Sequence, residues 1–134
     1  MSRVLGVDYG TKRVGLALSD TLGITASPLA TVPRPDVVDE VKNLVKEMDV
    51  GTIVVGLPTG LSGVEGMSAS EARKLADELG SATGVEVVLV DERYTSRIAE
   101  TSLLEAGMKR RERREKVDRV AAALILQDYL DNLR

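Results

Sequence analysis

The sequence predicts a mixed α/β fold with a five-stranded sheet that is antiparallel on one side, parallel on the other and flanked by helices. The first third of the chain contains three short segments typical of strands, and helical segments then alternate with two further strand segments. Strands joined by short turns pair antiparallel, whereas strands joined through a helix pair in parallel. With 134 residues, 43% of them hydrophobic, we expect a single domain over residues 1–134.

The first three segments predict an antiparallel meander. Val4–Val7 is a short apolar run that stops at the turn signal Asp8–Gly10. A second strand is expected over Arg13–Ser19 and a third over Ile24–Val32. Pro28 in the third segment indicates an edge strand or a bulge, because proline cannot donate a hydrogen bond to a neighbouring strand.

The remainder of the chain is predicted to alternate helices with strands. Asp36 and Ser68 stand at capping positions before two helical stripes. The glycine-rich segment Gly56–Gly66 is expected to be a mobile loop within the domain. The expected elements are a helix over Val37–Met48, a strand over Thr52–Gly56, a helix from Ser68 through Leu79, a strand over Val85–Val90, a helix from Thr95 or Ser96 to Gly107, and a helix from about Arg113 onward.

The composition excludes several kinds of active site. The chain has no Cys, His, Trp or Phe, and three tyrosines are its only aromatic residues. Zinc sites built from Cys and His, Ser-His-Asp triads and thiolate nucleophiles therefore lack an essential side chain. Aromatic platforms for base stacking are nearly excluded as well. Carboxylates, lysine, arginine, hydroxyl groups and any metal held by carboxylates remain for catalysis.

Two groups of carboxylates are predicted at one edge of the sheet. Asp8 ends the first strand, and Asp91 and Glu92 directly follow the last one. Active sites of open α/β sheets lie at the carboxyl ends of parallel strands, so these side chains are expected to meet at one rim. Asp is also an ordinary turn residue after a strand, and these residues alone leave that alternative equally open.

Asp118 is a third candidate. At about 100° per residue, a helix through Asp118 places Ala122 and Ile125 on the same apolar stripe. A carboxylate on that stripe is directed into the protein and must be paired or coordinated, because desolvating it alone is costly. We favour a coordinating role, and the alternative is a buried ion pair with an arginine, for example Arg93 or Arg97.

Three convergent carboxylates without His or Cys favour a hard divalent cation, Mg²⁺ or Mn²⁺. Ordinary carboxylates titrate at about 4 and lysine at about 10, so the chain has no side chain naturally poised near neutral pH. A bound cation activates water without such a group. Hydrolysis of a phosphodiester is the reaction class that fits these residues.

A basic segment stands out in an acidic chain. The net charge is −3, yet Lys109–Arg119 alone carries +4. We expect this segment to contact phosphate, and the alternative is a solvated helix start with Arg/Glu pairs. Lys12 and Arg13, at the first hairpin turn, are also expected to contact phosphate, and the alternative is that they are solvated turn residues. The predicted nucleic-acid-binding residues are Lys12, Arg13, Arg93, Lys109, Arg110, Arg111, Arg113 and Arg114.

Four segments together resemble one known family. In this order and at this spacing they are similar to the YqgF family of bacterial pre-16S rRNA nucleases, which are relatives of the RuvC-type Holliday junction resolvases. The match runs essentially from end to end of the chain. The segments are Asp8–Ala17, Val54–Pro58, Asp91–Ser96, and Lys116–Ala122 with Ile125–Leu130.

The resemblance implies a ribonuclease H-like fold and a divalent-metal nuclease that processes the 5′ end of precursor 16S rRNA. The family's acidic positions fall on Asp8, Glu92 and Asp118, which are then the catalytic residues and the ligands of Mg²⁺ or Mn²⁺. The implied partner is structured RNA, including precursor 16S rRNA on assembling ribosomes, or branched DNA, so cleavage of DNA junctions stays an alternative. The chain departs from the family pattern at Thr59–Gly63, where relatives carry more polar residues.

Two other classes of function compete with the nuclease. Asp8, Gly10, Thr11 and Gly15 also resemble the first phosphate loop of the actin, sugar-kinase and Hsp70 superfamily. Those proteins close two such domains around ATP, whereas this chain has the length of one. A noncatalytic nucleic-acid-binding or regulatory module is the third possibility. Metal-dependent cleavage, nucleotide binding and affinity alone are the observations that separate the three.

The N-terminus carries no pattern typical of a signal peptide. Asp8 interrupts the apolar residues there, and the longest unbroken apolar run is Val120–Leu126. We therefore expect a cytoplasmic protein without a membrane span, either a monomer or a homodimer.

Overall fold

The predicted strands form one five-stranded sheet. The computed structural model describes residues 2–10, 12–57, 67–91 and 110–133. Its strands are β1 Arg3–Asp8, β2 Arg13–Ser19, β3 Ala26–Pro33, β4 Val50–Leu57 and β5 Glu86–Asp91. They lie in the order β3-β2-β1-β4-β5.

The pairing of the strands confirms the predicted mixed sheet. β1 and β3 each pair antiparallel with β2, whereas β4 pairs in parallel with β1 and β5. Pro28 lies on the edge strand β3, beside a shift in register between Leu16 and Ala17, as predicted for a proline within a sheet. The parallel pairs require crossover connections, and α1 and α2 stand in those connections.

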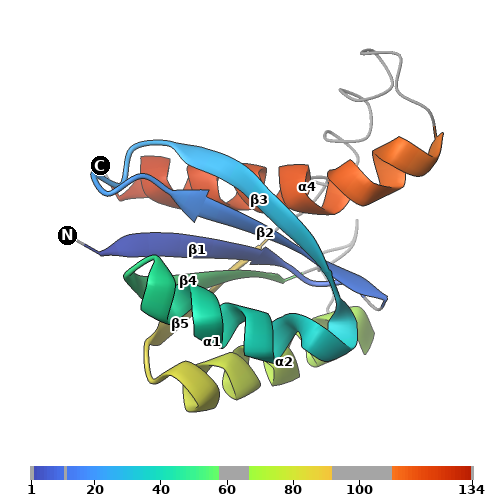
Figure 1. Cartoon of the computed structure of the whole chain (residues 1–134), viewed down its shortest axis with the longest axis horizontal. Coiled ribbons are helices and arrows are strands. Elements are labelled where there is room, and N and C mark those ends of the chain that lie inside the picture. Colours follow the sequence, from blue (N-terminus) through green and yellow to red (C-terminus); the bar gives the residue numbers. More distant parts are fainter. Residues whose placement is uncertain (1, 11, 58–66, 92–109, 134) are drawn as a thin grey trace.

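Helices cover both faces of the sheet (Figure 1). They are the 3₁₀ turn η1 Arg34–Asp36 and the helices α1 Val37–Glu47, α2 Met67–Thr83 and α4 Arg110–Asn132. Helices α1 and α2 lie on one face, and α4 lies across the other, over β1, β2 and β3. Of the loop predicted over Gly56–Gly66, Gly56 belongs to β4, which runs on to Leu57, and residues 58–66 fall outside the described residues. The helix predicted to end at Gly107 also falls outside them. Within the described part of the chain, no helix is long and apolar enough to cross a membrane.

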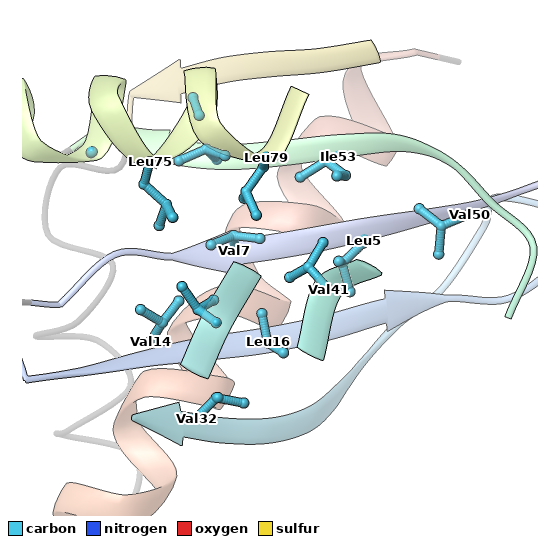
Figure 2. Packing of buried hydrophobic residues seen from close by; sticks show 14 of the residues in the cluster. Leu5, Val7, Val14, Leu16, Val32, Val41, Val50, Ile53, Leu75 and Leu79 are labelled. Atoms are coloured by element: carbon cyan, nitrogen blue, oxygen red, sulfur yellow. The ribbon is translucent and has the colours of Figure 1, made fainter. Parts of the chain in front are cut away.

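The larger core lies between the sheet and the pair α1 and α2. Leu5 and Val7 of β1 and Leu16 of β2 are completely buried there, against Val41 of α1 and Leu79 of α2 (Figure 2). Successive side chains of a strand point to opposite faces, so the residues between these positions face α4. The sequence alternation therefore decides which strand residues can reach the site.

Strand β3 begins two residues later than predicted, because the carboxylate of Asp20 closes a turn. Asp20 Oδ1 accepts hydrogen bonds from the backbone N–H of Ile24 at 2.8 Å and of Thr25 at 3.3 Å. The N–H of Ala26 donates to Gln127 Oε1 at 2.9 Å, and Gln127 Nε2 donates to the carbonyl of Ile24 at 2.8 Å. Gln127 thus fixes this turn to α4.

The helix starts predicted from capping residues need correction. Asp36 stands at the N-cap of α1 but makes no capping hydrogen bond, because it belongs to η1 and has helical backbone angles. Ser68 lies inside α2, which begins at Met67. Helix α4 begins at Arg110 rather than near Arg113, since the Arg and Glu residues of the basic segment are good helix formers.

Candidate active site

The carboxyl end of β1 carries a buried carboxylate. Asp8 is the last residue of β1 and is only 4% exposed. Its neighbour Val7 faces α1 and α2, so the side chain of Asp8 faces α4. In the sheet, Asp8 pairs with Gly15 of β2 and with Gly56 of β4. Asp8 is therefore flanked on both sides by residues that have no side chain.

Helix α4 rests so closely on β1 and β2 that two strand positions accept only glycine. A Cβ atom added to Gly15 would lie 1.8 Å from the carbonyl oxygen of Asp118, and one added to Gly6 would lie 2.8 Å from the Cβ atom of Leu126. Real Cβ atoms essentially never make contacts below 3.0 Å. Gly6 and Gly15 therefore determine how closely α4 approaches the sheet.

This close approach brings the backbone of Asp118 over the strand position that pairs with Asp8. Residues directly opposite each other in antiparallel strands have their Cβ positions on the same face. Asp8 and Gly15 form such a pair, and the backbone of Asp118 lies directly over Gly15. The rim predicted from the sequence thus carries Asp8 and Asp118 on one face, although most of the chain separates them in sequence.

Asp118 forms an ion pair with Arg13, the first residue of β2. Arg13 Nε–H donates a hydrogen bond to Asp118 Oδ2. The Asp118 side chain is 18% exposed and that of Arg13 is 38% exposed. Burial raises the pKa of Asp118 above its ordinary value, and the attraction and hydrogen bond of Arg13 only partly oppose this rise. The rim therefore holds a carboxylate whose negative charge is poorly solvated.

The ion pair changes the interpretation of Arg13. The sequence leaves an ion pair with an arginine as the alternative role for Asp118. Among the described residues, the arginine that forms this pair is Arg13. The two arginines suggested from the sequence, Arg93 and Arg97, lie outside the described residues. Arg13 is not a solvated turn residue, since it belongs to β2 and binds α4. Gly15, which the sequence indicated only through the competing phosphate-loop resemblance, is a further residue of the site. Its signal is a glycine inside a strand, which often marks a close backbone approach.

A hollow of about 230 Å³ opens beside the ion pair, lined by Gly10, Lys12, Arg13 and Asp118. A Cβ atom on Gly10 would lie 2.2 Å from the carbonyl oxygen of Arg13, so the loop between β1 and β2 is too tight for a side chain there. The tight loop brings two basic residues to the same hollow as Asp118. The hollow is several times larger than a water molecule, which takes up about 30 Å³ in the liquid.

The other predicted site residues are described only in part. Glu92, Arg93 and Lys109 lie outside the described residues. Asp91 ends β5, two strands away from β1 at the same edge of the sheet. The first turns of α4 project beyond the carboxyl end of β1 (Figure 1). These turns contain Arg110, Arg111, Arg113 and Arg114.

The donor atoms at the rim fit a divalent cation. Asp8 and Asp118 offer carboxylate oxygens on one face, which hard cations such as Mg²⁺ and Mn²⁺ prefer, and Asp118 already binds one positive group. Among the described residues, no three acidic side chains form a complete metal site. The third ligand that the family resemblance implies, Glu92, falls outside those residues.

The sheet order, the helices on both faces and the acidic rim define an α/β protein of the ribonuclease H-like class. A family model described as "RuvX: Holliday junction resolvase" matches residues 2–132. The chain belongs to this family. The match confirms the resemblance predicted from the four sequence segments.

Relatives match almost the whole chain. Proteins named "Putative pre-16S rRNA nuclease" are 48% identical in Anaeromyxobacter sp. (strain Fw109-5), over 96% of both chains, and 46% identical in Syntrophus aciditrophicus, over 96% of this chain and 88% of that one. Among solved structures, T. thermophilus RuvC in complex with a Holliday junction substrate has a TM-score of 0.58 at 14% identity, over 99% of this chain and 96% of that one. This likeness shows the fold alone and agrees with the predicted ribonuclease H-like sheet.

Proposed function

We propose that this protein is a divalent-metal-dependent nuclease that hydrolyses phosphodiester bonds. The proposal rests above all on the backbone of Asp118 lying over Gly15, the strand partner of Asp8, and on the hollow that Asp118 shares with Lys12 and Arg13. Carboxylates hold the cation in such enzymes, and basic side chains bind the phosphate. Membership of the family supports the same conclusion.

Each residue of the rim has a separate task in this proposal. Asp8, Asp118 and the implied third ligand Glu92 hold Mg²⁺ or Mn²⁺, which acidifies water and offsets negative charge on the phosphoryl oxygens. The burial of Asp8 and the close contact of α4 with Gly15 keep the two carboxylates in place before substrate arrives. Lys12 directs its charge to the phosphate in the hollow.

We propose precursor 16S rRNA, cut near its 5′ end in the cytoplasm, as the substrate. The names of the relatives support this choice. Recognition then depends on phosphates and RNA shape rather than on base stacking. The ring of Tyr9, the residue that follows β1, is already covered by the guanidinium of Arg34, whose Cζ lies 5.7 Å from the ring centroid.

A four-way DNA junction is the second candidate substrate. The description of the matching family names this substrate, and the fold is that of RuvC. The same rim would serve both reactions, because RNA and DNA present the same phosphodiester group. The surfaces that hold the remainder of the substrate would then decide between them.

The test compares the protein with Asp8→Asn and Asp118→Asn on a precursor 16S rRNA 5′ fragment and on a four-way DNA junction. Each substrate is incubated with Mg²⁺, Mn²⁺ or EDTA. We expect the unaltered protein to cleave with metal and not with EDTA. Both variants should fall to the EDTA background, because each replaces an anionic ligand with a neutral amide. Cleavage of the junction alone would favour the resolvase.

Asp128→Asn is the matched control, because Asp128 is exposed on the same helix as Asp118. It should cleave like the unaltered protein, and circular dichroism should show that all three variants are folded. Full cleavage by both Asp8→Asn and Asp118→Asn would refute the carboxylate mechanism. Tight binding without cleavage under any metal condition would instead indicate a noncatalytic module.

A further inference from the structure

The Arg13–Asp118 ion pair occupies the place where the proposed function needs a metal ion. We propose that Arg13 neutralises Asp118 only until the metal binds, and that the displaced guanidinium then turns into the hollow and binds the substrate phosphate. This inference rests on the proposed function, since it requires a divalent cation at the rim. It assigns Arg13 two successive partners, first a carboxylate and then a phosphate.

The geometry places Arg13 in direct competition with the cation. Arg13 stands two residues before Gly15 in β2, so both lie on the face that carries Asp8 and α4. Its Nε–H donates to Asp118 Oδ2, one of the oxygens that a cation between Asp8 and Asp118 would take. The positive charge of Arg13 and that of a metal ion would both stabilise the same carboxylate, and each would repel the other.

The metal-free protein needs such a counter-ion. The Asp118 side chain is largely buried, and a buried carboxylate without a partner is strongly destabilising. Arg13 supplies this counter-ion from a fixed backbone position, because Arg13 pairs with Pro33 of β3 in the sheet. The consequence is that part of the metal's binding free energy is used to separate an existing ion pair.

A displaced Arg13 remains close to the substrate. Its backbone is held in β2, its side chain is already 38% exposed, and it lines the same hollow as Lys12. A guanidinium presents donors that match two phosphate oxygens at once. Metal binding should therefore strengthen phosphate binding, and by linkage phosphate should strengthen metal binding.

The test measures Mn²⁺ affinity, by electron paramagnetic resonance without nucleic acid, for the protein and for Arg13→Gln and Lys12→Gln. Both variants remove one positive charge from the same hollow, so the general electrostatic effect is matched. Of these two residues, only Arg13 forms an ion pair with Asp118 in the described part of the chain. We expect Arg13→Gln to bind Mn²⁺ about fivefold or more tightly than Lys12→Gln does.

A second measurement follows the coupling to phosphate. Affinity for the precursor rRNA fragment is measured with and without Ca²⁺, a cation that also prefers oxygen ligands. In the unaltered protein and in Lys12→Gln, Ca²⁺ should raise RNA affinity by the same factor. In Arg13→Gln this factor should be clearly smaller, because no guanidinium is released. If Ca²⁺ raises RNA affinity by an equal factor in all three proteins, the claim that Arg13 binds the substrate phosphate is wrong.

The outcomes distinguish this inference from the proposed function. Absence of Mn²⁺ binding by the unaltered protein would refute the metal site and both proposals. Normal Mn²⁺ binding, with Arg13→Gln no tighter than Lys12→Gln, would overturn this inference alone. If circular dichroism shows that Arg13→Gln is unfolded, Arg13→Met decides. Because methionine has neither the charge nor a donor for Asp118, this variant should bind Mn²⁺ more tightly than the unaltered protein, and equal affinity would overturn the inference.

Discussion

Asp118 shows what a buried carboxylate costs in stability. Its carboxylate is largely buried on α4, and the pKa stays above the ordinary value of 3.8 despite the ion pair with Arg13. The ionised form is therefore less favourable in the folded protein than in the unfolded chain. A site that must hold a metal ion keeps such a carboxylate because metal binding offsets the cost of burial.

Asp118→Asn should raise the Tm of the metal-free protein by a few degrees at pH 7. The amide removes the buried negative charge, and its oxygen still accepts the hydrogen bond from Arg13. Because the folded-state pKa of Asp118 is raised, wild-type stability falls as pH increases from about 4 through that pKa. The gain in Tm should therefore be full above the raised pKa and vanish as pH approaches 4. Calorimetry over this pH range measures it.

Asp20→Asn is the control with the opposite sign. Hydrogen bonds to the carboxylate from the backbone, that of Ile24 foremost, lower the pKa of Asp20. Its stabilising effect is present above pH 4 and disappears as pH falls through the lowered pKa. Asp20→Asn should therefore lower Tm slightly at pH 7. A fall in Tm for both variants would contradict the assigned effect of burial on Asp118.

The sequence indicates some residues of the site and not others, for a physical reason. Asp8 and Asp118 stand out because a strand end and a helical stripe are local patterns. Arg13 stands out only as a basic residue at a turn, and its ion pair with Asp118 is not predicted, because that partner lies across a contact between β2 and α4 that no local pattern contains. The same holds for Gly15, whose role depends on the carbonyl of Asp118 above it.

At the scale of elements, the contact between α4 and the sheet positions the site. Gly6 and Gly15 let the helix backbone approach β1 and β2, while Gln127 fixes the turn before β3 to the same helix. The strand segments and the faces of their side chains could be predicted from alternation in the sequence. The ends of the elements could be predicted less well, because a side chain such as Asp20 decides whether a backbone N–H joins a turn or a strand.

Gly15→Ala should displace α4 and abolish cleavage. The added methyl group would meet the carbonyl oxygen of Asp118 at 1.8 Å, so the helix must move and the two carboxylates separate. We expect a decrease of about 1–3 kcal/mol or more in the free energy of unfolding, typical of overpacking. Urea denaturation and the cleavage assay measure the two effects.

Gly80→Ala is the matched control for this substitution. Gly80 lies within α2. The added Cβ atom would lie 3.5 Å from Val87 Cγ2, which is an ordinary van der Waals distance. Alanine should stabilise the helix by up to about 1 kcal/mol and leave cleavage unchanged. Full activity of Gly15→Ala would show that the position of α4 does not control the site.

The whole molecule combines an acidic body with a basic helix start. The net charge is −3, and the segment Lys109–Arg119 carries +4, so the remainder carries −7. From Arg110 onward this segment belongs to α4, whose first turns extend past the edge of the sheet that carries Asp8. An anionic substrate would thus be attracted to one end of the molecule and repelled elsewhere.

Reversing the charge of this segment should weaken RNA binding and its salt dependence. The double variant Arg110→Glu/Arg114→Glu should reduce the slope of log affinity against log salt by about 0.7 for each RNA phosphate that the protein no longer neutralises. Lys42→Glu/Lys46→Glu has the same spacing and charge change on α1, on the opposite face of the sheet, and should leave the slope unchanged. Equal slopes in both variants would show that the segment is only solvated.

The contact of α4 with Gly6 and Gly15 also fixes when the site can exist. The five strands of the sheet precede α4 in the chain, so synthesis delivers Asp8 early and Asp118 only after the sheet and the layer of α1 and α2. Until then the two glycines leave a bare strip on the sheet, with one carboxylate at its end. Under the proposed function, a growing chain would therefore not cleave nucleic acid until α4 docks on the sheet.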